Sequence, residues 1–204
     1  MDIPRYAIFI DGNTIFQGAK IHGCKIDYEK LTDWEDILDQ ENQYLVRKSF
    51  YSSRAGEETH GKLDFLHFMK RNDFRVIERR IAPRGDGRYS DIQVCIACDL
   101  LTFGKQLDEL MIIGPSLALE TPITRLQQIC PVRIRVAGFK SSTHPKIIDL
   151  ADEFIEFHDG KTTSDGTVIE PSNVKYWAKG GSTWSDRVEY DRRYEYSEEE
   201  DVEV

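Results

Sequence analysis

The sequence predicts an α/β fold with a mostly parallel central sheet and helices on both faces, and three observations support this class. Short apolar runs with β-branched or aromatic residues alternate with longer stretches at helical spacing throughout residues 1–158. Most of the short runs are too apolar for strands with one solvated face, which indicates a covered sheet. The chain of 204 residues, 40% of them hydrophobic, is long enough for one such core and short for two.

Five segments have the composition of strands, and a sixth is weaker. In order they are residues 6–10, 44–51, 74–79, 109–113, 132–137 and, as the weaker one, 153–157. Helical spacing is found between them, at residues 28–40, 59–70, 90–101, 118–128 and 145–150. This order predicts parallel strands joined by right-handed crossovers. Ligands of such sheets lie beyond the carboxyl ends of the strands, so the residues that follow each strand are the first candidates for a site.

Charge divides the chain into two parts. Residues 159–204 contain 12 acidic and 6 basic side chains, whereas residues 1–158 contain 24 and 21. The last segment also lacks a sustained apolar period and is interrupted by glycine and serine. We therefore expect one domain at 1–158 and an acidic, partly disordered C-terminal tail at 159–204. The tail contains six aromatic residues, which is unusual for disorder, so part of it could dock on the cleft or on a protein partner.

Composition excludes several classes of protein. The formal net charge of -9 excludes coating of nucleic acid through overall charge, so any contact with a polyanion must use a local patch. No run approaches about 18 apolar residues, and the start MDIPRYAIFIDGN lacks the features of a signal peptide. We therefore expect a cytoplasmic protein without a membrane partner. No motif of a serine hydrolase or of a P-loop nucleotide triphosphatase occurs.

The first predicted strand ends directly before a carboxylate. Asp11 follows the apolar run, Gly12 permits a sharp turn, and Asn13 can then face the same space. A carboxylate in this place could hold a hard cation. The alternative is that Asp11 or Asn13 caps the helix that follows, because an oxygen acceptor is favoured there. The residues alone leave both interpretations open.

Two more aspartates belong to the predicted helix at 90–101. Asp91 lies in its first turn, where the helix dipole stabilises a carboxylate. Asp99 comes eight residues later, roughly 12 Å along the axis at about 1.5 Å per residue, so one ion could hardly contact both. Among apolar neighbours, Asp99 either faces solvent or needs a donor, a proton or a cation.

Together these motifs resemble the NYN domain, a branch of the PIN-like nucleases that includes the LabA-like bacterial proteins. The matching elements, in order, are IDGN at 10–13, RYSD at 88–91, ACDLL at 97–101, IIGPS at 112–116 and ADEF at 151–154. The resemblance implies a Rossmann-like or PIN-like three-layer fold in which clustered carboxylates bind Mg²⁺ or Mn²⁺. It also implies cleavage of phosphodiester bonds, usually in RNA, by a metal-dependent ribonuclease.

The resemblance assigns roles to individual residues. Asp11 and Asp91 would be the principal metal ligands, Asn13 would position a phosphate or a water, and Asp99 would be a further acidic ligand. These four would be the catalytic residues. A divalent cation relieves the repulsion between crowded carboxylates, activates water and stabilises charge on the scissile phosphate. Arg88 stands where the family tends to have lysine, so a cation near the substrate phosphate is retained.

The loop after the fourth predicted strand departs from the family pattern. The family typically has S-G-D-x-D-F there, whereas this chain has GPSLALE at 114–120, with Pro115 and Leu117 where acids would be expected. A site with fewer acids could bind metal weakly and still cleave, or could have lost catalysis. The second hypothesis is therefore a catalytically impaired NYN module that binds RNA or a protein partner without cleavage.

Residues 70–88 form the main basic stretch of the chain, with seven basic and three acidic side chains. We expect Arg80, Arg84, Arg88 and the adjacent Tyr89 to contact nucleic acid, because arginine pairs with phosphate and tyrosine stacks on bases. The alternative is a solvated face with ordinary ion pairs, since alternate residues of a strand point in opposite directions. The sequence leaves the oligomeric state open, a homo-oligomer included.

Overall fold

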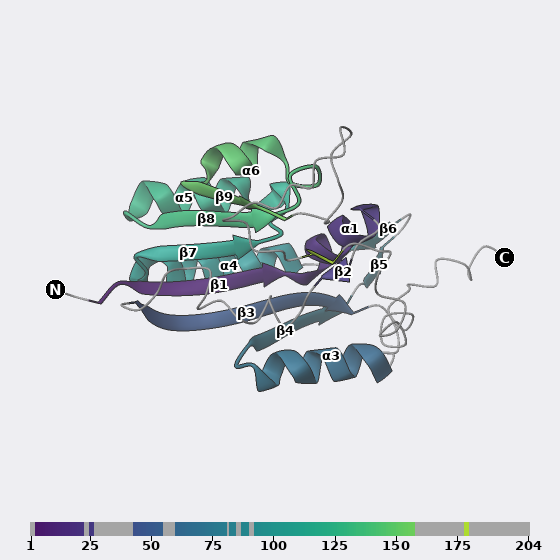
Figure 1. Ribbon diagram of the computed structural model, residues 1–204. Helices are drawn as coiled ribbons and strands as arrows, with labels where there is room; N and C mark the ends of the chain where they lie inside the picture. The colour runs from purple at the N-terminus through teal and green to yellow at the C-terminus, as the bar shows by residue number, and fades with distance from the viewer. Residues whose placement is uncertain are drawn as a thin grey trace.

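The computed structural model of the protein describes residues 3–22, 25–26, 43–54, 60–80, 82–84, 87–89, 92–157 and 178–179. Six strands form its central sheet in the order β4-β3-β1-β7-β8-β9, and every neighbouring pair is parallel (Figure 1). The strands are Arg5–Asp11 (β1), Tyr44–Arg54 (β3), Arg75–Arg80 (β4), Glu109–Ile113 (β7), Arg133–Gly138 (β8) and Glu153–Glu156 (β9). The predicted parallel α/β fold is thereby confirmed.

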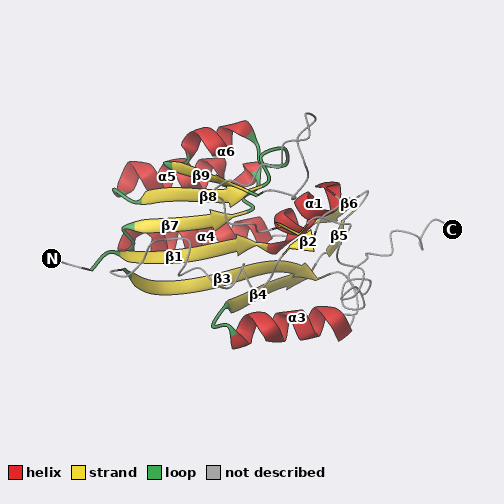
Figure 2. Ribbon diagram, viewed as in Figure 1, coloured by secondary structure: helices red, strands yellow, loops and turns green. Residues whose placement is uncertain are grey.

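Helices cover both faces of this sheet (Figure 2). They are Gly12–His22 (α1), His60–Arg71 (α3), Ile92–Phe103 (α4), Glu120–Ile129 (α5) and Pro145–Leu150 (α6), with short 3-10 helices at Gly104–Gln106 (η1) and Leu117–Leu119 (η2). α1 and α3 pack on one face, and α4, α5 and α6 pack on the other. The helix predicted at 28–40 lies outside the described residues.

The central strand β1 alternates its side chains between two apolar cores. Ile8 and Ile10 belong to the core under α1 and α3, whereas Ala7 and Phe9 belong to the core under α4, α5 and α6. All four are fully buried, which explains why this run of the sequence contains no polar residue. By the same alternation, Asp11 at the end of β1 falls on the face covered by α4.

α1 is not among the helical segments predicted from the sequence, since two of its eleven residues are glycines with low helix propensity. Both glycines are needed for close packing. A Cβ at Gly18 would approach the ring of Phe139 to 2.6 Å, and a Cβ at Gly12 would overlap the ring of Phe50. Ile15 and Ala19 lie one turn apart on the helix, and their burial holds α1 on the sheet despite its low helix propensity.

Two short antiparallel pairs lie beyond the main sheet, and neither was predicted. β5 (Ala82–Arg84) pairs with β6 (Gly87–Tyr89), and β2 (Lys25–Ile26) pairs with β10 (Ala178–Lys179). Strands of two or three residues are too short to show a period in the sequence. β2, β5 and β6 lie on the side toward which the sheet strands point (Figure 1).

No helix of the described residues is long and apolar enough to span a bilayer.

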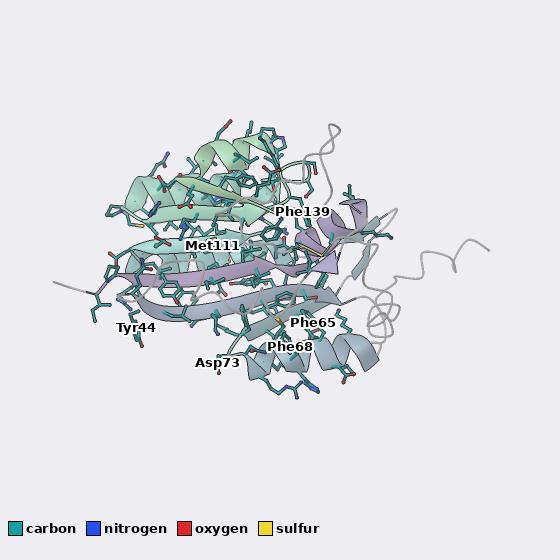
Figure 3. The ribbon with its side chains drawn as sticks, viewed as in Figure 1. Tyr44, Phe65, Phe68, Asp73, Met111 and Phe139 are labelled. Atoms are coloured by element: carbon teal, nitrogen blue, oxygen red, sulfur yellow. The ribbon has the colours of Figure 1, made fainter. Side chains whose placement is uncertain are left out.

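The turn from α3 to β4 holds a residue with left-handed backbone. Asp73 has a φ of 62°, and it lies where α3 ends (Figure 3). The N–H of Phe74 donates to the carbonyl of Met69 at 3.0 Å, and the N–H of Asp73 donates to the carbonyl of Lys70 at 3.2 Å. This is the Schellman pattern, in which glycine is the preferred residue at the left-handed position.

Replacing Asp73 tests this turn. Asp73→Gly should raise the free energy of unfolding by about 0.5–1 kcal/mol, because glycine adopts the left-handed conformation without a steric penalty. Asp73→Ala is the matched control, since it also removes the carboxylate but keeps the Cβ. Urea denaturation measures both, and an equal gain in the two variants would contradict the explanation.

Candidate functional site

The order of the strands locates a crevice beside β1. The chain places β3 and β4 on one side of β1 and then crosses to place β7, β8 and β9 on the other. In parallel α/β sheets, ligands bind outside the carboxyl ends of the strands where this reversal occurs. In Figure 1 the arrows of β1, β3 and β7 point toward the side of the sheet where α1 begins. Asp11, the last residue of β1, is therefore at the expected position.

Asp11 is buried and fully supplied with hydrogen bonds. The residue is only 1% exposed. Oδ1 accepts from the backbone N–H groups of Asn13 (3.1 Å) and Thr14 (3.3 Å). Oδ2 accepts from Oγ1 of Thr14 (2.8 Å) and from Nε2 of Gln93. The bonds to the first turn of α1 show that Asp11 caps this helix, as one of the two interpretations expected.

Burial makes the ionised form of this carboxyl costly. Desolvation raises the pKa of Asp11 above its ordinary value of 3.8, while the hydrogen bonds from Gln93, Thr14 and Asn13 act in the opposite direction. None of the ion pairs within the described part of the chain involves Asp11. The carboxylate is thus held by neutral donors rather than by a cationic side chain.

A second buried carboxylate, that of Glu109, lies at the opposite end of the sheet and is paired with an arginine. Glu109 begins β7 and is 7% exposed, and Nη1 of Arg135 lies 3.1 Å from its Oε1. Arg135 also contacts Glu153, with Nε 2.9 Å from Oε2. Here an arginine balances the buried negative charge. Asp11 has no such partner among the described residues.

Polar side chains of several elements form a hydrogen-bond network with Asp11. Oε1 of Gln93, in the first turn of α4, accepts from Oγ of Ser116, which follows β7, at 2.8 Å. Nδ2 of Asn13 donates to Oγ of Ser53 at the end of β3, and the N–H of Ser53 donates back to Oδ1 of Asn13 at 3.0 Å. Nζ of Lys62 on α3 donates to the carbonyl of Ser53 at 2.7 Å. The network therefore joins β1, α1, β3, α3, α4 and the loop after β7.

A glycine turn brings this loop close to Asp11. Gly114 has a φ of +65°, which places it in the left-handed region. A Cβ there would lie 3.1 Å from the backbone N of Ile15 and 3.2 Å from the carbonyl oxygen of Asp11. The tight turn directs the chain toward α4, where Ser116 reaches Gln93.

Asp11 and Asn13 belong to one hydrogen-bond network, whereas Asp99 is bonded to Tyr51. Oη of Tyr51 donates to Oδ2 of Asp99 at 2.8 Å. Asp99 lies six residues after Gln93 on α4, a rise of about 9 Å along the helix. Burial, followed by the negative charge of Asp99, raises the pKa of Tyr51, so its hydroxyl stays protonated and available as a donor.

The remaining predicted residues are only partly described. Asp91 lies outside the described residues and directly precedes α4. The backbones of Arg80, Arg84, Arg88 and Tyr89 belong to β4, β5 and β6, while their side chains are not described. In the loop that departs from the family pattern, Pro115 is buried and Leu117 is 43% exposed.

The side-chain atoms around Asp11 that could ligate a metal are all oxygens. Besides the carboxylate, Oγ1 of Thr14, Oε1 of Gln93 and Oγ of Ser116 lie in its hydrogen-bond network. Oxygen donors suit Mg²⁺ or Mn²⁺ better than zinc, and one carboxylate is the lower end of what Mg²⁺ accepts when water and substrate phosphate complete the shell. No group of three or more His, Cys, Asp or Glu side chains is placed for a metal within the described ranges. The residues present therefore fit a weakly held hard cation.

Four polar members of the site were not predicted from the sequence, namely Thr14, Ser53, Gln93 and Ser116. All four are neutral, and none belongs to a motif of acidic or basic residues. One signal could have indicated Gln93: a buried carboxylate requires donors, and this residue lies in the first turn of the helix that covers the Asp11 face.

The parallel sheet defines a Rossmann-like domain. Its polar site lies at the carboxyl ends of the strands, at the switch point, where the strand order reverses beside β1. The sequence matches the NYN domain over residues 5–162, and the chain belongs to this family. NYN domains are part of the PIN-like nuclease superfamily, whose members are generally dependent on divalent metals. The family suggested by the sequence motifs is thereby confirmed.

A solved structure supports the same fold. The chain is similar to the crystal structure of a protein of unknown function from Vibrio parahaemolyticus, with a TM-score of 0.67 and 19% sequence identity. The similarity covers 78% of this chain and 96% of that one. A comparison with curated proteins gives no match.

Replacing Asp11 should reveal the cost of burying its charge. Because the pKa of Asp11 is raised, the folded state binds the proton of this carboxyl more tightly than the unfolded state does. The protonated carboxyl therefore contributes fully to the free energy of unfolding below pH 3.8. This contribution is lost as the pH rises through the pKa of the folded state. Asp11→Asn keeps a capping oxygen and avoids the charge. Each unit of pKa elevation corresponds to about 1.4 kcal/mol, so the variant should gain stability over the wild type as the pH rises.

Urea denaturation between pH 4 and pH 8 in EDTA measures this difference, with the exposed Asp149→Asn as the control for loss of one carboxylate. A stability difference between Asp11→Asn and the wild type that does not change with pH would contradict the assigned cause.

The contact of Tyr51 with Asp99 gives a separate prediction. Tyr51→Phe should lower the free energy of unfolding by about 1–2 kcal/mol, because the carboxylate of Asp99 loses its donor. Asp99→Asn, which keeps an acceptor oxygen, should cost less and should leave Mn²⁺ affinity unchanged. A marked loss of Mn²⁺ affinity in Asp99→Asn would show that Asp99 is a ligand after all.

Proposed function

We propose that this NYN domain is a ribonuclease that hydrolyses RNA phosphodiester bonds with a bound Mg²⁺ or Mn²⁺. The observation that carries the proposal is the buried carboxylate of Asp11, held at the switch point by neutral donors and without an ion pair in the described part of the chain. A divalent cation would stabilise this charge. Membership of the NYN family supports the reaction class.

Residues around Asp11 would divide the work. Asp11 would hold the cation together with Asp91, which directly precedes α4, and with neutral oxygens from α4 and the loop after β7. When bound, the cation lowers the pKa of a water molecule and stabilises charge on the scissile phosphate. Asn13 is fixed by two hydrogen bonds with Ser53, so its orientation is set before the substrate arrives, which suits a residue that positions phosphate or water.

RNA would approach along the β5–β6 pair. This pair lies beyond the carboxyl ends of the sheet (Figure 1), and its strands contain Arg84, Arg88 and Tyr89. Arginine binds phosphate oxygens with paired donors, and tyrosine stacks on unpaired bases, so single-stranded RNA is the expected substrate. Arg80, the last residue of β4, would extend this contact toward the sheet.

The second candidate is a NYN module that binds RNA without cleaving it. The observation that favours it is the chemistry of the side chains that contact Asp11: Gln93 is neutral, and its own partner Ser116 is neutral. The loop after β7 also carries no acid at Pro115 or Leu117. In this case the polar network would be structural, and RNA affinity would persist in EDTA.

A cleavage assay separates the two functions. The full chain is incubated with labelled single-stranded RNA or DNA in Mg²⁺, Mn²⁺ or EDTA, beside Asp11→Asn, Asp91→Asn and the surface control Asp149→Asn. The ribonuclease proposal expects metal-dependent cleavage of RNA that falls at least about 100-fold in the first two variants and is unchanged in the third. Binding of RNA without cleavage in any metal would instead support the non-catalytic module.

A further inference from the structure

Gln93 is the side chain of α4 that contacts the carboxylate of Asp11. Its Nε2 donates to Oδ2 of Asp11, and its Oε1 accepts from Oγ of Ser116 at 2.8 Å. The ionised form of Asp11 requires this orientation, because a carboxylate can only accept hydrogen bonds and so needs the amide nitrogen beside it. Oδ2 is otherwise bound only by Thr14 within the described network. Without metal, the amide of Gln93 therefore supplies part of the positive field that a cation would provide.

We propose that Gln93 decides whether Asp11 accepts a divalent cation, an inference that rests on the proposed function. Half a turn of the amide exchanges its two ends, so that Oε1 faces the cation beside Asp11 and Nε2 donates to Ser116. A hydroxyl both donates and accepts, so Ser116 keeps its bond to Gln93 in either orientation. Gln93 positions Asp11 in the metal-free protein and becomes an oxygen ligand in the metal-bound protein.

A glutamate at this position would behave differently. It would place a second carboxylate within hydrogen-bond distance of Asp11, which is already buried. Two carboxylates this close repel each other when both are ionised, which destabilises the metal-free protein. A divalent cation between them is bound more tightly than beside a single carboxylate. The neutral amide thus favours a stable metal-free fold over high cation affinity, and Mn²⁺ binding in solution should show this balance.

The test uses the full chain and three variants. Gln93→Glu adds the second carboxylate, Gln93→Leu removes both amide atoms at similar size, and Gln106→Glu adds the same charge on the exposed surface of η1. Free Mn²⁺ is measured by electron paramagnetic resonance during a titration. We expect Gln93→Glu to bind Mn²⁺ at least about tenfold more tightly than the wild type, and Gln93→Leu about tenfold more weakly. Gln106→Glu should match the wild type.

Two further measurements separate a ligand from a merely structural residue. Without metal, Gln93→Glu should melt at a lower temperature than the wild type, and Mn²⁺ should reverse the order. In ¹H–¹⁵N spectra, the side-chain amide resonance that is missing in Gln93→Leu should move when Mg²⁺ is added to the wild type, because its hydrogen-bond partner changes. A resonance that does not move while Mg²⁺ binds would overturn the reorientation.

The outcomes distinguish the inference from the function on which it rests. Wild-type binding and cleavage together with unchanged Mn²⁺ affinity in Gln93→Leu and Gln93→Glu would overturn the role of Gln93 and leave the ribonuclease proposal standing. Binding by Gln93→Glu but not by the wild type would overturn the role of Gln93 as an oxygen ligand and would replace the ribonuclease with the non-catalytic module. Absence of Mn²⁺ binding in every folded variant would overturn both.

Discussion

The site depends on one constraint, which is that a carboxylate buried at the end of the central strand must obtain its hydrogen bonds from the protein. Asp11 meets this requirement through the first turn of α1 and through Gln93 on α4. These bonds fix where both helices begin relative to β1, and Ser116 extends the constraint to the loop after β7. The carboxylate therefore organises the crevice in which it lies.

The same constraint connects stability with function. A salt bridge like that of Glu109 with Arg135 would hold a buried acid more simply, yet Asp11 retains a raised pKa and only neutral partners. Proteins commonly keep such costly groups where a ligand must complete the site. The two apolar cores on either side of β1 provide the stability that tolerates this cost.

Much of the fold could be predicted because apolar runs record burial directly. The predicted strand at 109–113 coincides with β7, and the predicted helix at 145–150 coincides with α6. α1 was missed because its glycines serve packing against Phe50 and Phe139, which a local pattern does not reveal. Of the site, Asp11 and Asn13 were predicted from their place after a strand. Gln93 was not, since its role comes from a partner 82 residues away in the chain.

The central claim is that Asp11 is the carboxylate at which a hard cation binds. Anomalous diffraction from crystals of the full chain grown with Mn²⁺ tests it most directly. The account predicts a manganese peak at coordination distance from a carboxylate oxygen of Asp11, about 2.1 Å, with the Gln93 amide no longer donating to it. Manganese bound elsewhere, with the hydrogen bonds of Asp11 unchanged, would contradict it.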